Sequence, residues 1–177
     1  VMALAKQAQP MLDTRFAKHL LARTSDIVDA TDATPESDGG WRTNAAGFHF
    51  NQRYGFGLID ADELTQMAVE YAGVTTLTTQ STGTVAVNQT LADTDSRTVQ
   101  FALTATQPLE EVVVTIDFET TNAFPLEVNL TAPSGYRTRL VEGTAIMPSQ
   151  AHTRMAWRYV ANALWGESPA GTWTLEL

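Results

Sequence analysis

The spacing of hydrophobic positions changes along this chain, from a helical period in the first part to a strand period in the last. Between residues 1 and 24, apolar side chains recur every three or four residues, and Pro10 divides this stretch into two predicted helices. Asp13 precedes the second helix and is placed to cap its first turn. The apolar face that this helix would bury contains Phe16, Leu20 and Leu21.

The middle of the chain is polar until a third helical pattern begins. Residues 25–53 are rich in turn-forming residues and predict a long surface loop. In residues 54–57, Tyr-Gly-Phe-Gly, we expect the two glycines where backbone segments approach closely or adopt a positive φ. Asp60 or Asp62 then caps a predicted helix that ends at Gly73. Its apolar face contains Leu64, Met67, Ala68 and Tyr71.

Strand-like alternation replaces helical spacing after residue 73. The threonine-rich residues 74–90 predict a linker that leads into a first strand. In the last strand, Trp173, Leu175 and Leu177 share one face. Short alternating strands separated by turns predict a mainly β fold, a β-sandwich of the jelly-roll type. Beyond the linker, strands are predicted at residues 99–105, 112–118, 126–131, 137–141 and 172–177.

The composition limits the classes of function. Of the 177 residues, 44% are hydrophobic, which suffices for a buried core in one or two domains. The net charge of −9 argues against binding to nucleic acid or to anionic membranes. No apolar run approaches the roughly 20 residues that a membrane-spanning helix needs. Because the chain has no cysteine, disulfides, thiolate metal sites and a cysteine nucleophile are excluded.

Residues with catalytic potential are few. The three histidines, His19, His49 and His152, fall in a predicted helix, an aromatic stretch and a predicted loop. A catalytic histidine needs a serine and an orienting acid beside it, and the sequence contains no Gly-x-Ser-x-Gly or Gly-Thr-Ser element. Ser134, in Pro-Ser-Gly, is a turn former. We therefore predict structural or solvated histidines and no catalytic residue in this chain.

Acidic residues gather in the long loop, at Asp26, Asp29, Asp32, Glu36 and Asp38. Calcium needs about six to eight converging oxygens, and this spacing matches no loop pattern such as that of an EF-hand. A solvated acidic loop is the favoured interpretation, and a single peripheral calcium site is the alternative, so the metal ligands stay unknown. Asp93 and Asp95 receive the same interpretation.

The aromatic residues Trp41, Tyr54, Phe56, Trp165 and Trp173 are expected to fill cores. The alternative is a solvent-facing aromatic row on the sandwich, which would bind sugars. Asn88 and Asn129 each begin an Asn-x-Thr sequon, which matters only in a eukaryotic secretory pathway.

Several stretches resemble one protease family. Residues 41–47 and 54–61 are similar to the last part of a subtilisin-type catalytic domain. Residues 165–175, Trp-Gly-Glu-Ser-Pro-Ala-Gly-Thr-Trp-Thr-Leu, closely resemble the end of the P domain of kexin- and furin-like proprotein convertases and their bacterial relatives. Residues 1–24 resemble the two helices that follow the catalytic serine in that family.

The resemblance implies that residues 1–73 are the C-terminal remnant of a subtilisin-like catalytic domain and that 74–177 are a P domain, shortened at its end. The parent is then a secreted serine endopeptidase whose catalytic triad lies upstream, and this chain is expected to be a fragment that is inactive alone. The P domain would pack on the catalytic domain, stabilise it and shape substrate access. The family also implies calcium in the parent, whereas no cofactor is predicted in this chain.

The resemblance also implies partners for this chain. At one position, before the strand near Leu126, the sequence departs from the family's motif. The expected partners are the protein's own catalytic domain and protein substrates. Residues 133–135 and Trp157 stand where the family has a Ser-Pro-x-Gly turn and a tryptophan. However, Phe124 and Pro125 replace the Gly-Asp that usually precedes the strand near Leu126, so a calcium function at that corner is not carried over.

A function of another class stays open, namely a stand-alone β-sandwich for binding or adhesion, including binding to carbohydrate. The helices predicted within residues 1–73 count against it, because a binding module does not need them. Without the strands of a parent sheet, the apolar faces of residues 1–24 predict disorder, packing on the sandwich or pairing between molecules.

Overall fold

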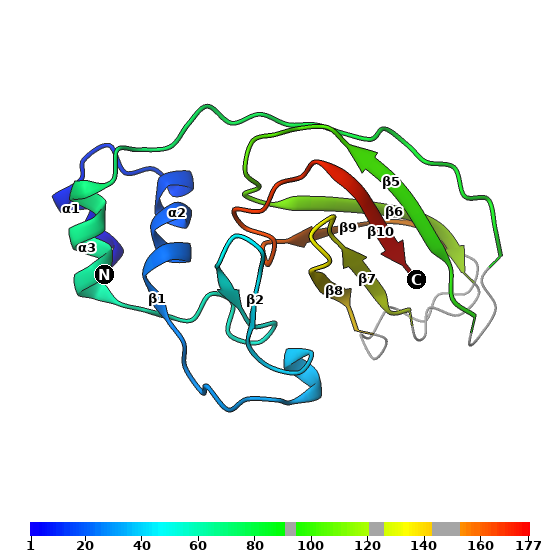
Figure 1. Cartoon of the computed structure of the whole chain (residues 1–177), viewed down its shortest axis with the longest axis horizontal. Helices are drawn as coiled ribbons and strands as arrows, with labels where there is room; N and C mark the ends of the chain where they lie inside the picture. The colour runs from blue at the N-terminus through cyan, green and yellow to red at the C-terminus, as the bar shows by residue number, and fades with distance from the viewer. Residues whose placement is uncertain (91–94, 121–125, 143–152) are drawn as a thin grey trace. The chain divides into compact units, whose positions relative to one another are not determined.

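Helices form only in the first part of the described chain, and the long strands form only in the second (Figure 1). The computed structural model describes residues 1–90, 95–120, 126–142 and 153–177. The chain divides into two compact units, Val1–Thr78 and Thr79–Leu177, and the division falls within the threonine-rich segment. Each unit has a hydrophobic core of its own.

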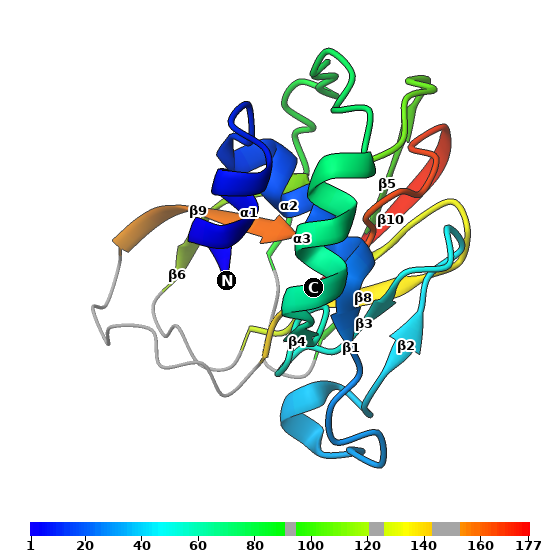
Figure 2. The ribbon, with the colours of Figure 1, turned by 90° about the vertical axis from the view of Figure 1, so that its left-hand side faces the viewer.

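The first unit is built on three helices, α1 (Met2–Ala8), α2 (Thr14–Thr24) and α3 (Ala61–Glu70) (Figure 2). Two aspartates cap α2 and α3, as the sequence predicts. An Asp13 oxygen accepts a hydrogen bond from the backbone N–H of Phe16 at 2.7 Å, and Asp60 accepts one from Glu63 at 2.8 Å. Of the two candidate caps for α3, the structure therefore selects Asp60.

The apolar faces of α1 and α2 pack against α3. None of the three outcomes expected for residues 1–24 included this partner, and the expected disorder is wrong. The helix α3 also ends at Glu70, before the predicted Gly73, because Tyr71 turns into extended backbone and packs against the ring of Phe16 at 5.4 Å. The buried residues of this core are Ala5, Leu12, Phe16, Ala17, Leu20, Leu64 and Ala68.

The segment between α2 and α3, which includes the predicted surface loop, contains two short antiparallel ladders and a 3-10 turn, η1 (Pro35–Ser37). In the first ladder, β1 (Ser25–Asp26) pairs with β4 (Leu58–Ile59). In the second, β2 (Arg42–Thr43) pairs with β3 (His49–Phe50). Gly57 lies beside the first ladder with φ of 119°, and a Cβ there would stand 2.1 Å from the carbonyl oxygen of Asp26. The close approach expected for this glycine is confirmed.

The second unit is an antiparallel sandwich. One sheet has the order β5-β10-β7-β8, and the other consists of β6 and β9. The sandwich prediction is therefore confirmed. The strands are β5 (Thr98–Leu103), β6 (Val112–Thr120), β7 (Val128–Thr131), β8 (Arg137–Val141), β9 (Thr153–Ala161) and β10 (Gly171–Glu176).

Two details of the strand prediction were wrong. Residues 74–90 form no strand, and β9 was not predicted at all. The strand β9 pairs along its whole length with β6, in a register that sets Trp157 opposite Ile116. The two sheets enclose one core, in which the predicted inward face of β10 is confirmed. Its buried residues are Val128, Leu130, Ala132, Ala161, Leu164, Trp173 and Leu175.

Candidate functional site

The acidic loop is fixed by side chains from residues 51–54, and we call Asp29, Asp32, Asn51 and Tyr54 the loop cluster. Asn51, only 1% exposed, donates from Nδ2 to Asp32 Oδ2 at 2.8 Å. The Tyr54 hydroxyl donates to Asp29 Oδ2 at 3.0 Å. These bonds tie two parts of the loop that lie far apart in the sequence.

Hydrogen bonding also sets the ionisation of the loop cluster. The bond from Asn51, with weaker ones from Ser37 and Thr34, lowers the pKa of Asp32 from 3.8 to about 2, although partial desolvation opposes the shift. The bond to Asp29 is the main reason that the pKa of Tyr54 is raised. Asp32 is therefore a carboxylate at any pH in which the protein is expected to work.

The acidic residues do not converge. Asp29 and Asp32 point to separate partners, and Asp38 pairs with Arg42. In the part of the chain that the structure describes, no three histidine or acidic side chains are grouped to hold a metal ion. The loop is thus organised by hydrogen bonds to its carboxylates, which the sequence interpretation as a solvated loop did not anticipate.

The described histidines lie in structural surroundings. His49 Nε2 is 3.0 Å from the carbonyl oxygen of Ser25 and 2.7 Å from that of Phe56. Because carbonyl oxygens only accept, this nitrogen must carry the proton, and it holds β3 to the first ladder. His19 lies on α2, where the guanidinium of Arg23 bonds to its backbone oxygen at 2.9 Å. His152 lies outside the described residues.

Ser134 and Glu167 link two loops at one corner of the sandwich. Ser134 Oγ donates to Glu167 Oε2 at 2.6 Å, and the Glu167 side chain is almost fully buried. The backbone of Gly135 donates to Ala132 at 2.9 Å and closes the predicted turn. Ser134 thus fastens the turn to the loop before β10, and we call this contact the corner link.

Sequence reasoning recognised the turn at Ser134 but missed Glu167. The only signal was an acidic residue inside the stretch of residues 165–175, between the two tryptophans. The backbone strengthens the same corner, because Leu109 N donates to Glu167 O at 2.9 Å and Gly166 N donates to Leu109 O at 2.7 Å. This arrangement of hydrogen bonds holds the loops at this corner in position.

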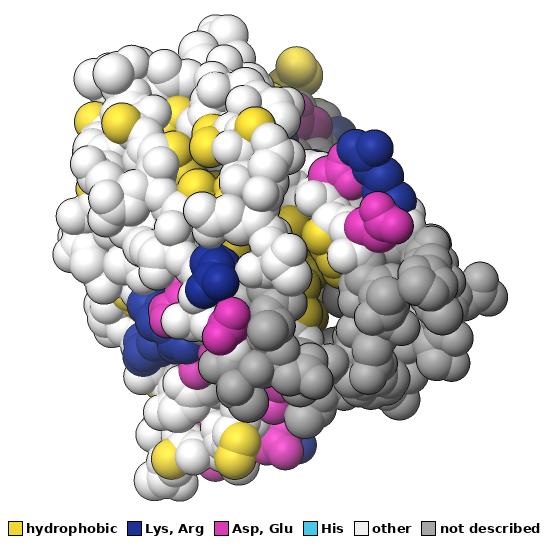
Figure 3. All heavy atoms as spheres, turned by 90° about the vertical axis from the view of Figure 1, so that its right-hand side faces the viewer, with side chains coloured by type: hydrophobic (Ala, Val, Ile, Leu, Met, Phe, Trp, Pro, Cys, Tyr) yellow, Lys and Arg dark blue, Asp and Glu magenta, His cyan; other side chains and the backbone are white. Residues whose placement is uncertain are grey.

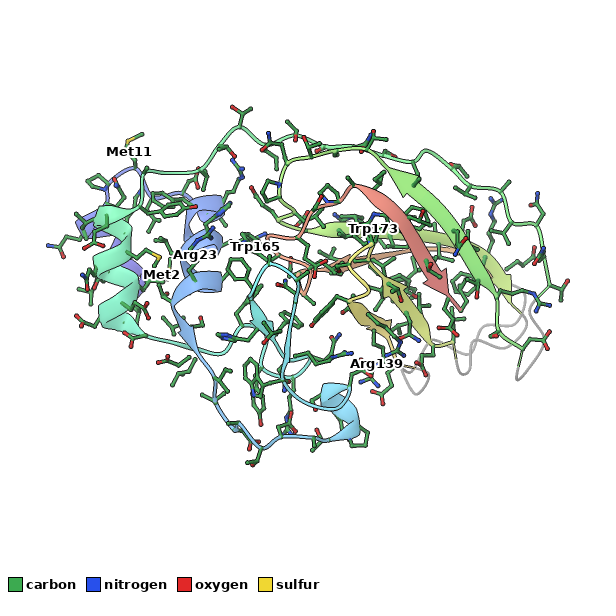
Figure 4. The ribbon with its side chains drawn as sticks, viewed as in Figure 1. Met2, Met11, Arg23, Arg139, Trp165 and Trp173 are labelled. Atoms are coloured by element: carbon green, nitrogen blue, oxygen red, sulfur yellow. The ribbon has the colours of Figure 1, made fainter. Side chains whose placement is uncertain are left out.

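The aromatic residues at this corner are core residues. Trp173, which is labelled in Figure 4, is fully buried. It stacks on Phe101 at 6.3 Å and donates from Nε1 to the carbonyl oxygen of Pro169 at 2.9 Å. Trp165 is 4% exposed. Neither ring offers a face to a sugar, so the argument for a carbohydrate platform at these two tryptophans fails.

The aromatic side chains within residues 41–56 are half-buried. Trp41 stacks on Tyr54 at 6.2 Å and donates from Nε1 to the carbonyl oxygen of Val28 at 2.8 Å. Phe56 meets Phe50 edge-on at 5.3 Å. These rings contact one another, but Trp41, Tyr54 and Phe56 belong to neither buried core, so the expected core position is met only in part.

The two sequons differ in accessibility. Asn129 is 6% exposed and donates to Glu127 Oε1 at 2.8 Å, so a glycan cannot be attached there in the folded unit. Asn88 is exposed, with φ of 47°. Asp93, Phe124 and Pro125 lie outside the described residues, whereas Asp95 pairs with Arg97 at 3.2 Å.

Several charged side chains of the sandwich pair with a charge of opposite sign. In the view of Figure 3, basic and acidic side chains lie beside one another. Arg154 Nε donates to Asp117 at 2.9 Å, and this bond holds the pKa of Asp117 below its usual value. Arg137 bonds in the same way to Glu127 at 3.2 Å. Local pairing of this kind does not form the broad charged surface of a nucleic-acid-binding protein.

Comparisons with known proteins agree across both units. Residues 109–177 match the family model of the proprotein convertase P-domain. The whole chain is 30% identical to proprotein convertase subtilisin/kexin type 5 from Homo sapiens, of which it covers 10%, and 28% identical to kexin from Saccharomyces cerevisiae, of which it covers 22%.

A solved structure matches both units as well. The serine protease of Aeromonas sobria superimposes on 99% of this chain with a TM-score of 0.81 and 27% sequence identity. This chain covers 35% of that protein. The similarity therefore extends over the helical unit and the sandwich, but it spans only a small part of each relative.

Proposed function

Because residues 109–177 match a proprotein convertase P-domain and subtilisin/kexin-family homologues extend over the whole chain, we propose that this chain is the C-terminal part of a secreted subtilisin-like serine endopeptidase. The observation that carries the proposal is the match to one serine protease over 99% of the chain, with 27% identity. A stand-alone sandwich would match only in its second unit.

In this proposal, residues 1–73 complete the catalytic domain and 74–177 form the P domain. Support for the first assignment comes from the two ladders and the capped helix α3, which give residues 41–61 a definite structure. The serine, histidine and aspartate of the triad belong to the part of the protein that precedes this chain. The catalytic chemistry is then acyl transfer to serine, assisted by histidine.

The sandwich has a supporting role in the proposal. It packs on its own catalytic domain, stabilises that domain and shapes the access of protein substrates. A rigid, well-filled core suits this role, and Trp173 and the corner link both contribute to it. We assign no nucleic-acid or membrane partner. None of the described helices has the length and apolar character to cross a membrane.

Active-site labelling of the native protein tests the proposal. A fluorophosphonate probe should label a protein longer than 177 residues, and peptides of this chain should be found in the labelled band by mass spectrometry. The 177-residue chain by itself serves as the control and should stay unlabelled, since the members of a catalytic triad act as a unit.

Two results would overturn the proposal. One is stoichiometric labelling of a serine within residues 1–177. The other is a native protein that contains this chain, is folded and secreted, and has no reactive serine under conditions that label a control subtilisin.

A further inference from the structure

The two units are joined by an exposed segment, residues 74–90, which we call the connector. It has no regular secondary structure, and every residue from Thr75 to Thr90 is exposed. An exposed segment of this length normally behaves as a flexible tether. Side-chain contacts nevertheless fasten the connector at two positions.

The first contact lies on the helical unit. Arg15, near the start of α2, donates from Nη1 to the carbonyl oxygen of Thr75 at 2.6 Å. The preceding residue, Val74, packs against the helical core. The chain is therefore held to the first unit as far as Thr75.

The second contact lies on the sandwich and uses the whole amide group of Gln80. Its Oε1 accepts from the backbone N–H of Ala105 at 2.7 Å and from that of Thr104 at 3.1 Å. Its Nε2 donates to Thr104 Oγ1 at 3.0 Å. One side chain thus makes three bonds to the backbone and side chain that follow β5.

We propose that Arg15 and Gln80 form a double clamp on the connector, which confines free movement between the two units to residues 76–79. Without Gln80, the next hydrogen bond that the described residues make from the connector to the sandwich is at Thr90, whose carbonyl oxygen accepts from Arg97 at 3.3 Å. An extended chain from Thr75 to Thr90 reaches roughly 50 Å, whereas from Thr75 to Gln80 it reaches roughly 17 Å.

The clamp therefore shortens the tether about threefold. A shorter tether raises the effective concentration of one unit around the other, because the chance of encounter falls steeply with linker length. This effect needs no particular arrangement of the two units. It belongs to the chain itself and does not depend on the protease assignment.

Hydrogen exchange and distance measurements on Gln80 variants of the 177-residue chain test the clamp. In Gln80→Leu, which keeps the size but loses all three bonds, the amides of Thr104 and Ala105 should exchange at least about fivefold faster. The chain has no cysteine, so Val69→Cys and Ala102→Cys allow spin labels to be placed on exposed positions of α3 and β5. The distribution of label distances should broaden in Gln80→Leu and in Arg15→Met.

The conservative variant and a matched control sharpen the test. Gln80→Glu keeps an acceptor oxygen for the two backbone amides and places a second oxygen where Nε2 stood. The hydroxyl of Thr104 can turn to donate to that oxygen, so the distance distribution of this variant should stay narrow. Gln89→Ala removes another exposed glutamine of the connector and should change neither readout. An unchanged β-sheet circular dichroism signal shows that each variant is folded.

The proposal requires both readouts to respond. It is overturned if Gln80→Leu leaves the amide exchange unchanged, or if exchange accelerates while the distance distribution keeps its parental width. It is also overturned if Gln89→Ala broadens the distribution as much as Gln80→Leu does.

Discussion

Trp173 makes both an apolar and a polar contact inside the sandwich. Its ring stacks on Phe101, and its Nε1 reaches the carbonyl oxygen of Pro169, so that both the apolar and the polar part of the side chain are satisfied without water. Pro169 belongs to the loop before β10. The tryptophan therefore couples the packing of the core to the position of that loop.

Replacing Trp173 by alanine should lower the free energy of unfolding by about 3–5 kcal/mol, a large share of the roughly 5–15 kcal/mol that a domain has. Urea denaturation followed by circular dichroism measures this. Arg137→Ala is the control, because the bond to Glu127 is largely exposed and should contribute about 1 kcal/mol or less. Equal denaturation midpoints for the two variants would contradict the core position of Trp173.

The lowered pKa of Asp32 predicts that the stability of the folded protein depends on pH. The pKa of Asp32 in the folded protein, about 2, lies below the ordinary 3.8, so its ionised form contributes stability that is fully present above about pH 4 and is lost as the pH falls toward 2. Asn51→Ala removes the largest cause and should move the pKa of Asp32 up toward 3.8, which an NMR titration of the side-chain carboxyl carbon detects.

The matched control for this titration is Gln66→Ala, on the exposed side of α3. This variant should leave the titration of Asp32 unchanged. If Asn51→Ala also leaves it unchanged, the hydrogen bond from Asn51 is not what holds the pKa down.

At the scale of elements, the corner link joins the turn between β7 and β8 to the loop before β10. Ser134→Ala leaves the buried Glu167 carboxylate without one donor, and an unsatisfied buried group costs about 1–3 kcal/mol. Ser168→Ala, in the same loop but exposed, should change the urea midpoint little. Similar midpoints for the two serine variants would show that the corner link does not stabilise the sandwich.

Some elements could be predicted because their determinants are local. The helices α2 and α3 begin at aspartates, and the strand β10 alternates strictly, so sequence position alone sets the cap and the inward face. The turn at Ser134 is likewise a local Pro-Ser-Gly feature.

Other elements depend on distant partners and could not be predicted. On β9, the apolar residues Ala156 and Val160 lie on the outer face, so hydrophobic and polar residues do not alternate clearly along this strand. Residues 153–161 form a strand because they pair with β6. Threonines favour strands, yet residues 74–90 lack the large inward side chains that would bury a face. The burial of Glu167 is set by a turn more than thirty residues away.

At the scale of the whole molecule, the two cores share no residue. The first is formed by the three helices with Leu12 and Val74, and the second by the two sheets. We therefore expect that the loss of a side chain from one core leaves the packing of the other unchanged. The connector lies between them in the sequence, and its described contacts at Arg15 and Gln80 each stay within one unit.

Separate cores predict that the sandwich folds without the helical unit. A chain that begins at Thr79 keeps Gln80, residues 79–90 of the connector and the six described strands of the sandwich. It should retain the β-sheet circular dichroism signal and the fluorescence of a buried tryptophan at Trp173. Its urea midpoint should match that of the sandwich transition in the full chain, because no buried residue of its core is removed. Adding Trp173→Ala to the short chain should lower this midpoint as it does in the full chain. Loss of the β-sheet signal in the short chain would show that the helical unit is needed for the sandwich to fold, and the two units would then be one cooperative domain.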